Sequence, residues 1–177
     1  DISEMLTTIG INVFHHTVVG DNPERLKQAM EIAMSRADII ITTGGLGPTC
    51  DDLTKNVIAD ALGLPLVYHP EEEERLRTYI ERRHREITPN MFQQAYLPEG
   101  CTRFVNDWGT APGCAVEKDG LTVIMLPGPP KECRKMMEYR VLPYLAGKSG
   151  GTIVSHNYKI FGMGEAEMEQ ILRPMMN

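Results

Sequence analysis

The chain has 177 residues, enough for one domain with a substantial core, and its net charge of −6 excludes a broad positive surface of the kind that holds nucleic acid. Its four cysteines are dispersed without a C-x-x-C pair, so we expect reduced thiols rather than a disulfide framework. No apolar run approaches the roughly 18 residues of a membrane span, and the first residues lack the features of a signal peptide, so we expect a cytoplasmic protein with no membrane partner.

Helical and extended patterns alternate in the first part of the chain. Apolar residues at helical spacing predict a helix over residues 2–9, and an extended pattern predicts a strand over 11–19. The cap sequence Asp21-Asn22-Pro23 begins a helix that runs to about Arg36. The unalternating isoleucines at 39–41 are typical of a parallel strand covered on both faces, so we place this strand in the centre of the sheet.

The middle of the chain continues this alternation and adds one hairpin. Helices are expected at residues 52–62, 71–86 and 89–94, and the last two should lie at the periphery of the sheet. Lys118-Asp119-Gly120 is a turn signal between two extended stretches, which predicts a hairpin over residues 114–126. The sheet should therefore contain some antiparallel pairs beside the parallel ones.

The last part of the chain predicts a helix at residues 130–144, and later a strand at 152–161 and a helix at 165–172. We expect an α/β domain over residues 1–146, with three α/β/α layers and a mostly parallel sheet. Residues 147–177 should then be a glycine-rich linker with the start of a following strand and helix.

The segment from Thr42 to Thr54 is the first candidate site. It leaves the end of the expected isoleucine strand and enters a helix, which is where open α/β sheets place their ligands. Gly44, Gly45 and Gly47 let backbone amides approach an anion, and the helix N-terminus adds further donors. The segment matches neither a Walker A loop nor the dinucleotide fingerprint. We therefore predict a phosphate-binding turn of another kind.

Two adjacent acids, Asp51 and Asp52, lie in this turn. A carboxylate about 4 Å from a phosphate oxygen would cost about 4 kcal/mol at an effective dielectric constant of 20. A hydrated Mg²⁺ or Mn²⁺ ion between them would reverse that sign and would polarise phosphorus for attack by water. The alternative is that both acids only stabilise the N-terminal end of a helix. We favour the metal.

Two further loops are candidates for the same site. Residues 126–132 follow an apolar strand and contain Lys131, whose ammonium group can reach a phosphate; the alternative is a stiff proline turn that starts a helix. Residues 106–113 combine an amide, a hydroxyl, two glycines and Trp108, a composition that is also found in ligand-binding loops. On composition alone, the alternative of a surface loop with Trp108 packed on the core is favoured.

Four segments in order resemble one family. Residues 44–54 resemble the G-G-L-G-P-T-x-D-D-x-T signature of the competence/damage-inducible protein CinA family. Residues 109–113, 126–132 and 161–165 are similar to the family's G-T-A-P-G, L-P-G-P-P-x-E and F-G-[IM]-G-E elements. The likeness runs from about Gly20 to the end of the chain. The family's opening strand and its G-T-E-L-rich segment have no counterpart in this sequence, so we expect one strand of the family's sheet to be missing.

The resemblance implies a fold and an activity. The layout is also similar, more distantly, to the molybdopterin-binding domains of MogA and MoeA, which have an R-D-x-T motif. In this chain Asp52 corresponds to the aspartate of that motif, and Asp51 takes the place of its arginine. In the CinA family the N-terminal domain is associated with metal-dependent hydrolysis of ADP-ribose to AMP and ribose 5-phosphate. A separate C-terminal amidase domain deamidates nicotinamide mononucleotide, and nothing in this chain resembles it.

The leading hypothesis is a pyrophosphatase that acts on ADP-ribose or a similar nucleoside diphosphate with Mg²⁺, Mn²⁺ or Co²⁺. Asp52 is the main expected metal ligand and Asp51 the second, and both belong to the expected catalytic set together with Lys131, which would offset developing charge. Asn106 and Thr110 would orient the sugar or base. The whole expected substrate-binding set is Thr43, Gly44, Gly45, Gly47, Thr54, Asn106, Gly109, Thr110 and Gly128.

Two other functions stay open at this point. One is a module that binds a pterin or a nucleotide without turning it over, and the other is a pterin adenylyltransferase of the MogA type. Related folds commonly associate, so we expect a homo-oligomer. An apolar contact surface could come from Met136, Met137, Met175 and Met176; the alternative is that these methionines fill the core.

Overall fold

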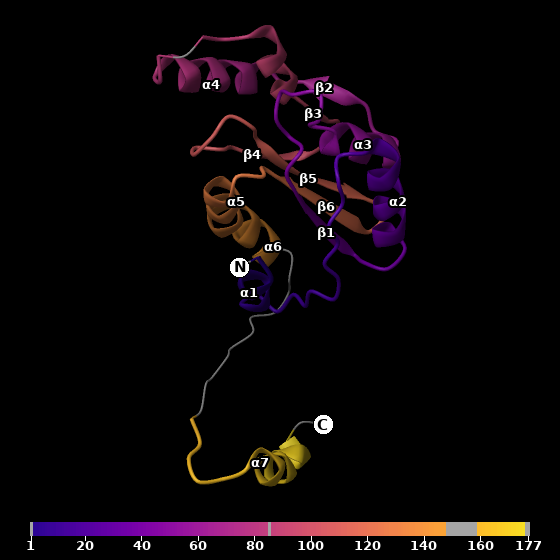
Figure 1. Ribbon diagram of the computed structural model, residues 1–177, viewed down its shortest axis with the longest axis vertical. Helices are drawn as coiled ribbons and strands as arrows, with labels where there is room; N and C mark the ends of the chain where they lie inside the picture. Colours follow the sequence, from indigo (N-terminus) through magenta and orange to yellow (C-terminus); the bar gives the residue numbers. More distant parts are fainter. Residues whose placement is uncertain (1, 85, 148–158, 176–177) are drawn as a thin grey trace.

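The computed structural model describes residues 2–84, 86–147 and 159–175, and its main feature is a four-stranded sheet (Figure 1). The strand order is β1-β6-β5-β4, with bounds Ile39–Thr43, Leu121–Leu126, Gly113–Lys118 and Thr102–Phe104. β1 pairs with β6 in parallel, whereas β6 with β5 and β5 with β4 are antiparallel. For the described strands the prediction of a mostly parallel sheet is therefore wrong, because the hairpin folds β6 back on β5.

Helices cover both faces of this sheet, which confirms the three layers. α2 (Pro23–Met34) and α3 (Thr54–Ala61) pack on one face. On the other face lie α1 (Ile2–Thr7), α5 (Pro130–Met136) and α6 (Leu142–Ala146), with the π-helical turn η2 (Met137–Val141) between the last two. The alternation of β6 shows the division, since Val123 and Met125 join the first core cluster while Ile124 and Leu126 join the second.

A smaller unit lies beyond one end of the sheet (Figure 1). It contains α4 (Pro70–Glu81), the 3₁₀ helix η1 (Pro89–Ala95) and an antiparallel pair of strands, β2 (Leu66–Tyr68) with β3 (Tyr96–Pro98). The peripheral position of the two helices is as predicted. The short strands β2, β3 and β4 were not predicted, because three residues are too few to show an alternation.

Local signals placed most helix ends correctly. Asn22 caps α2 by accepting a hydrogen bond from the backbone N–H of Arg25, and Gly63 ends α3 with φ of +63°. The hairpin turn at Asp119 and Gly120 takes positive φ at both residues. The helix predicted over 71–86 ends at Glu81 instead, shortly before His84 takes φ of +52°.

Two strand predictions are wrong. Residues 11–19 form no strand, and Phe14 and Val18 are 81% and 99% exposed. The physical reason is that the segment pairs with no strand among the residues that the structure describes, and an extended segment without a hydrogen-bonded neighbour is not a strand. β1 is accordingly an edge strand of the described sheet rather than its centre.

The end of the chain was predicted only in part within the described residues. α7 (Glu165–Leu172) confirms the last helix and leads into η3 (Arg173–Met175), whereas residues 159–161 are irregular. The rest of the expected strand at 152–161, and most of the expected linker, lie outside the described residues. No helix in the described part of the chain is long and apolar enough to cross a membrane.

Lys55 is a buried cation that ties α3 to η1. Lys55 is 7% exposed, and its Nζ donates a hydrogen bond of 2.5 Å to the carbonyl of Gln93. Burial lowers the pKa of Lys55 from 10.5 to about 8, although Cys114 and Asp52 oppose this shift by favouring the charged form. The charged form of the amine is thus less stable in the folded protein than in the unfolded chain.

The Lys55→Met variant should therefore be less sensitive to alkaline pH than the wild type. Between pH 8 and pH 10.5 the unfolded wild type binds more protons at this lysine than the folded protein does, so raising the pH stabilises the fold by up to about 1.4 kcal/mol per pH unit. Urea unfolding at pH 7, 8.5 and 9.5 measures this gain, with the exposed Lys27→Met as control. If the free energy of unfolding changed with pH by the same amount in the wild type and in Lys55→Met, the lowered pKa of Lys55 would be contradicted.

Candidate functional site

The loop between β1 and α3 lies against the loop between β6 and α5. Thr43 aligns with Leu126 at the ends of the two parallel strands, and the N–H of Gly44 donates to the carbonyl of Leu126 at 2.9 Å. A Cβ on Gly128 would lie only 3.2 Å from the Cα of Gly44, so the two backbones come close because neither residue has a side chain. The structure thus brings together two of the three candidate segments.

Two glycines of the first loop make room for polar side chains. Gly45 has φ of +68°, and a Cβ there would lie 2.0 Å from the hydroxyl oxygen of Thr54, the first residue of α3. A Cβ on Gly47 would lie 2.4 Å from Oδ2 of Asp52. The side chains of Thr54 and Asp52 therefore contact the loop backbone where a Cβ atom on either glycine would clash with them.

The two acids of this loop differ in their surroundings. Oδ2 of Asp52 accepts hydrogen bonds from the backbone N–H and the hydroxyl of Thr49, at 2.9 and 2.6 Å, and Asp52 is half-buried. Asp51 is exposed, and hydrogen bonding to Thr49 and to its own backbone lowers its pKa. α3 starts at Thr54 rather than at residue 52, so both acids lie in the turn before the helix.

These acids are a sparse set of metal ligands. Among the described residues, no group of three or more His, Cys, Asp or Glu side chains is placed to hold a metal ion. A cation bound here would take one or two carboxylates from this part of the chain and its other ligands from water and from a phosphate. That mixture is typical of Mg²⁺, which keeps several waters and is held by few carboxylates.

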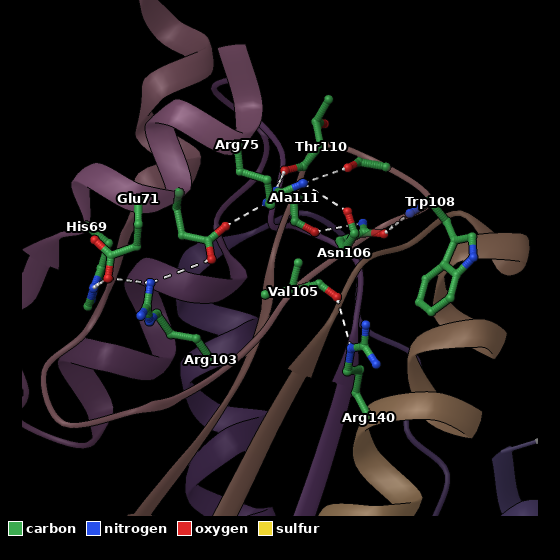
Figure 2. A network of polar contacts seen from close by, with 12 residues as sticks. His69, Glu71, Arg75, Arg103, Val105, Asn106, Trp108, Thr110, Ala111 and Arg140 are labelled. Atoms are coloured by element: carbon green, nitrogen blue, oxygen red, sulfur yellow. Dashed lines mark hydrogen bonds and ion pairs between the residues drawn. The ribbon is translucent and has the colours of Figure 1, made fainter. Parts of the chain in front are cut away.

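The third segment, residues 106–113, is attached to the second through Asn106 and Glu132. Asn106 is 0% exposed, and its Nδ2 donates to the carbonyl of Ala111 and to Oε2 of Glu132, both at 2.8 Å. Its Oδ1 accepts from the N–H of Trp108 at 3.0 Å (Figure 2). A Cβ on Gly109 would lie 1.8 Å from Oε2 of Glu132. The amide of Asn106 thus holds its own loop.

Arg75 of α4 anchors the same loop and was not predicted. Its guanidinium donates to the carbonyls of Asn106, Gly109 and Thr110, at 2.9, 3.2 and 2.5 Å, and to the buried carboxylate of Glu72 at 2.8 Å (Figure 2). The sequence does hold a signal for this role. Glu72 and Arg75 occupy the same helix face as the apolar Leu76, and charged residues on a buried face need partners.

The remaining predicted residues lie at the surface of these loops. Lys131 is exposed in the first turn of α5, and Thr43 and Gly128 are exposed at the loop ends. The side chain of Thr110 points away from the polar network in Figure 2, although its carbonyl belongs to it. A depression of about 340 Å³ lies nearby, between α2 and α3, where Leu53 and Val57 contribute to its lining.

Comparison with known proteins gives the family. The family described as "Probable molybdopterin binding domain" matches residues 1–147. A "Putative competence-damage inducible protein" of Acetivibrio thermocellus is 51% identical over 176 residues, which are 99% of this chain and 43% of that protein. The chain therefore spans less than half the length of this relative.

Solved structures agree with this result. The protein CinA from Thermoplasma acidophilum is 30% identical with a TM-score of 0.70, covering 82% of this chain and 83% of that one. A molybdopterin biosynthesis protein from Mycobacterium abscessus, 18% identical with a TM-score of 0.51, covers 83% of this chain and 78% of that one and shares the fold. The predicted resemblance and fold are confirmed. The chain belongs to the molybdopterin-binding domain family and, within it, to the CinA-like proteins.

Proposed function

We propose that this domain hydrolyses the pyrophosphate bond of ADP-ribose or of a related nucleoside diphosphate, with a divalent cation at Asp51 and Asp52. One observation carries the proposal: a glycine loop holds an anchored carboxylate beside a second loop at the carboxyl ends of two paired parallel strands. Sheets of this kind bind their ligands at that edge.

The loop and the acids have complementary tasks in this reaction. Backbone amides of Gly44, Gly45 and Gly47 would hold the diphosphate, and hydrogen bonding to Thr49 lowers the pKa of Asp51 and so favours its charged form. Mg²⁺, Mn²⁺ or Co²⁺ would offset the repulsion between the carboxylates and the diphosphate and would polarise a phosphorus atom. Water would add to that phosphorus and lose a proton to the solvent, the bridging P–O bond would break with its oxygen staying on the departing phosphate, and the products would be AMP and ribose 5-phosphate.

Residues of the other two segments have further roles in this proposal. Lys131 is exposed in the first turn of α5, just after the loop that touches Gly44, where an ammonium group can offset negative charge on the bridging oxygen. Thr110 remains a candidate contact to the sugar. Asn106 was expected to orient the sugar or base, but its amide is fully buried and bonded within the protein, so we assign it the positioning of its own loop instead.

A second candidate is a module that binds molybdopterin or a nucleotide without hydrolysis. One observation favours it: the description of the matching family names molybdopterin binding. A ligand that raises the melting temperature while no product appears with any divalent ion would select this function over the first.

The Asp52→Asn variant should lose turnover and keep its fold. The amide oxygen of asparagine can still accept the hydrogen bonds from Thr49, but the neutral group binds a cation weakly, so AMP release should fall about 100-fold or more. The assay measures AMP released from ADP-ribose with Mg²⁺, Mn²⁺ or Co²⁺. The melting temperatures of the variant and the wild type should be equal, which shows that the fold is kept. Asp60→Asn, on the exposed side of α3, is the matched control. Full activity in Asp52→Asn, or no AMP from the wild type, would contradict the proposal.

The Lys131→Gln variant should lower kcat more than it raises KM. If the ammonium group acts on charge that develops during bond breaking, its loss should reduce kcat about tenfold to a hundredfold, since each tenfold step corresponds to about 1.4 kcal/mol of barrier. The control is Arg36→Gln, which removes an exposed positive charge just before β1, at the end of that strand opposite the loops. A purely structural or long-range effect is indicated if both variants change kcat equally.

A further inference from the structure

Aromatic and cationic side chains gather beside the three loops. The rings of Trp108 and Tyr139 lie 5.7 Å apart between centroids, with 32° between their planes. Nζ of Lys135 and Cζ of Arg140 lie 5.6 and 5.8 Å from the centroid of the Trp108 ring. Tyr139 is 52% exposed and Trp108 is half-buried. We call these four residues the aromatic platform.

The backbone holds Trp108 in a defined position. Its N–H donates to Oδ1 of the fully buried Asn106, and its carbonyl accepts a hydrogen bond of 3.0 Å from the hydroxyl of Tyr79. Arg75 bonds the carbonyls on either side, at Asn106 and Gly109. A preorganised ring loses little conformational freedom when a ligand stacks on it, which favours binding.

A series of contacts links the platform to the proposed phosphate site. Gly109, the residue after Trp108, packs directly on the carboxylate of Glu132 in the first turn of α5. Lys135 follows Lys131 by four residues on that helix, which is about one turn, or about 6 Å along its axis. The loop before α5 contacts Gly44. The platform and the glycine loop are thus connected through α5 and the loop before it.

We propose that the aromatic platform binds the heteroaromatic ring of a phosphorylated ligand whose phosphate lies on the glycine loop. This inference rests on the proposed function for the phosphate site and adds the recognition of the base. Stacking on aromatic side chains is sequence-tolerant because every base has a π face, and Lys135 adds positive charge beside the ring. Arg140 also lies beside the ring, and its charge is paired with Asp107 at 2.6 Å. A phosphorylated sugar without a base would contact the loop alone.

Trp108 is the single tryptophan of the chain, so its fluorescence reports on this platform without any turnover. AMP should quench it, whereas ribose 5-phosphate should displace AMP and restore the signal without quenching by itself. Dihydroneopterin phosphate is the second arm: quenching by this pterin but not by AMP would support the platform and contradict the nucleotide substrate. Binding of AMP by calorimetry without quenching would overturn the platform and leave the proposed phosphate site standing. Absence of binding by all three ligands would overturn both.

The Tyr139→Leu variant tests the platform while keeping the reporter. AMP affinity should fall about 5- to 150-fold, the range for loss of one stacking partner, and ribose 5-phosphate affinity should stay within about twofold. Tyr139→Phe retains a ring and should restore AMP affinity. Tyr96→Leu, which removes an exposed tyrosine that stacks on Tyr68 in the other unit, is the matched control. Equal loss of affinity for AMP and ribose 5-phosphate in Tyr139→Leu would overturn the inference.

Discussion

Parallel pairing of β1 with β6 is the constraint on which the rest of the site depends. Because the two strands run in the same direction, both end at the same edge of the sheet, with Thr43 beside Leu126. The hydrogen bond from Gly44 to Leu126 and the contact between Gly44 and Gly128 then join two loops that are distant in sequence. The acid pair and Lys131 share one edge only because of this pairing, and a shift of register by one residue would turn every side chain of β1 to the opposite face.

The third loop is held by polar contacts instead of by a strand end. Buried carbonyls need donors, and an unpaired one costs about 1 to 3 kcal/mol, so the guanidinium of Arg75 and the amide of Asn106 stabilise a loop that has no regular hydrogen bonding. Glu72 and Glu132 in turn satisfy these donors. α4, a helix at the periphery of the sheet, thus helps to fix this loop: Arg75 bonds the carbonyl of Thr110 (Figure 2), and Tyr79 bonds that of Trp108.

Charges are distributed around the joined loops in a way that suits a metal-bound diphosphate. The exposed Asp51 and the anchored Asp52 supply negative charge on the side of α3, whereas Lys131 and Lys135 supply positive charge on the side of α5. Lys55 lies buried in the first turn of α3 and interacts favourably with Asp52. A cation would bind near the acids, and a phosphate or a base would lie toward the lysines, which is the arrangement that the proposed function and the aromatic platform require.

The sequence by itself determined the features whose physical cause lies within a few residues. The cap of α2 at Asn22, the hairpin turn at Asp119 and Gly120, and the glycine turn with its two acids could all be predicted, because caps and positive φ angles are set by neighbouring residues. The four ordered motifs likewise placed the chain in its family. The tertiary structure alone decided that β1 is an edge strand of the described sheet, that residues 11–19 form no strand, that Asn106 is buried, and that Arg75 holds a loop. A strand and a buried polar group are defined by hydrogen-bond partners far away in the chain, and no local pattern contains those partners.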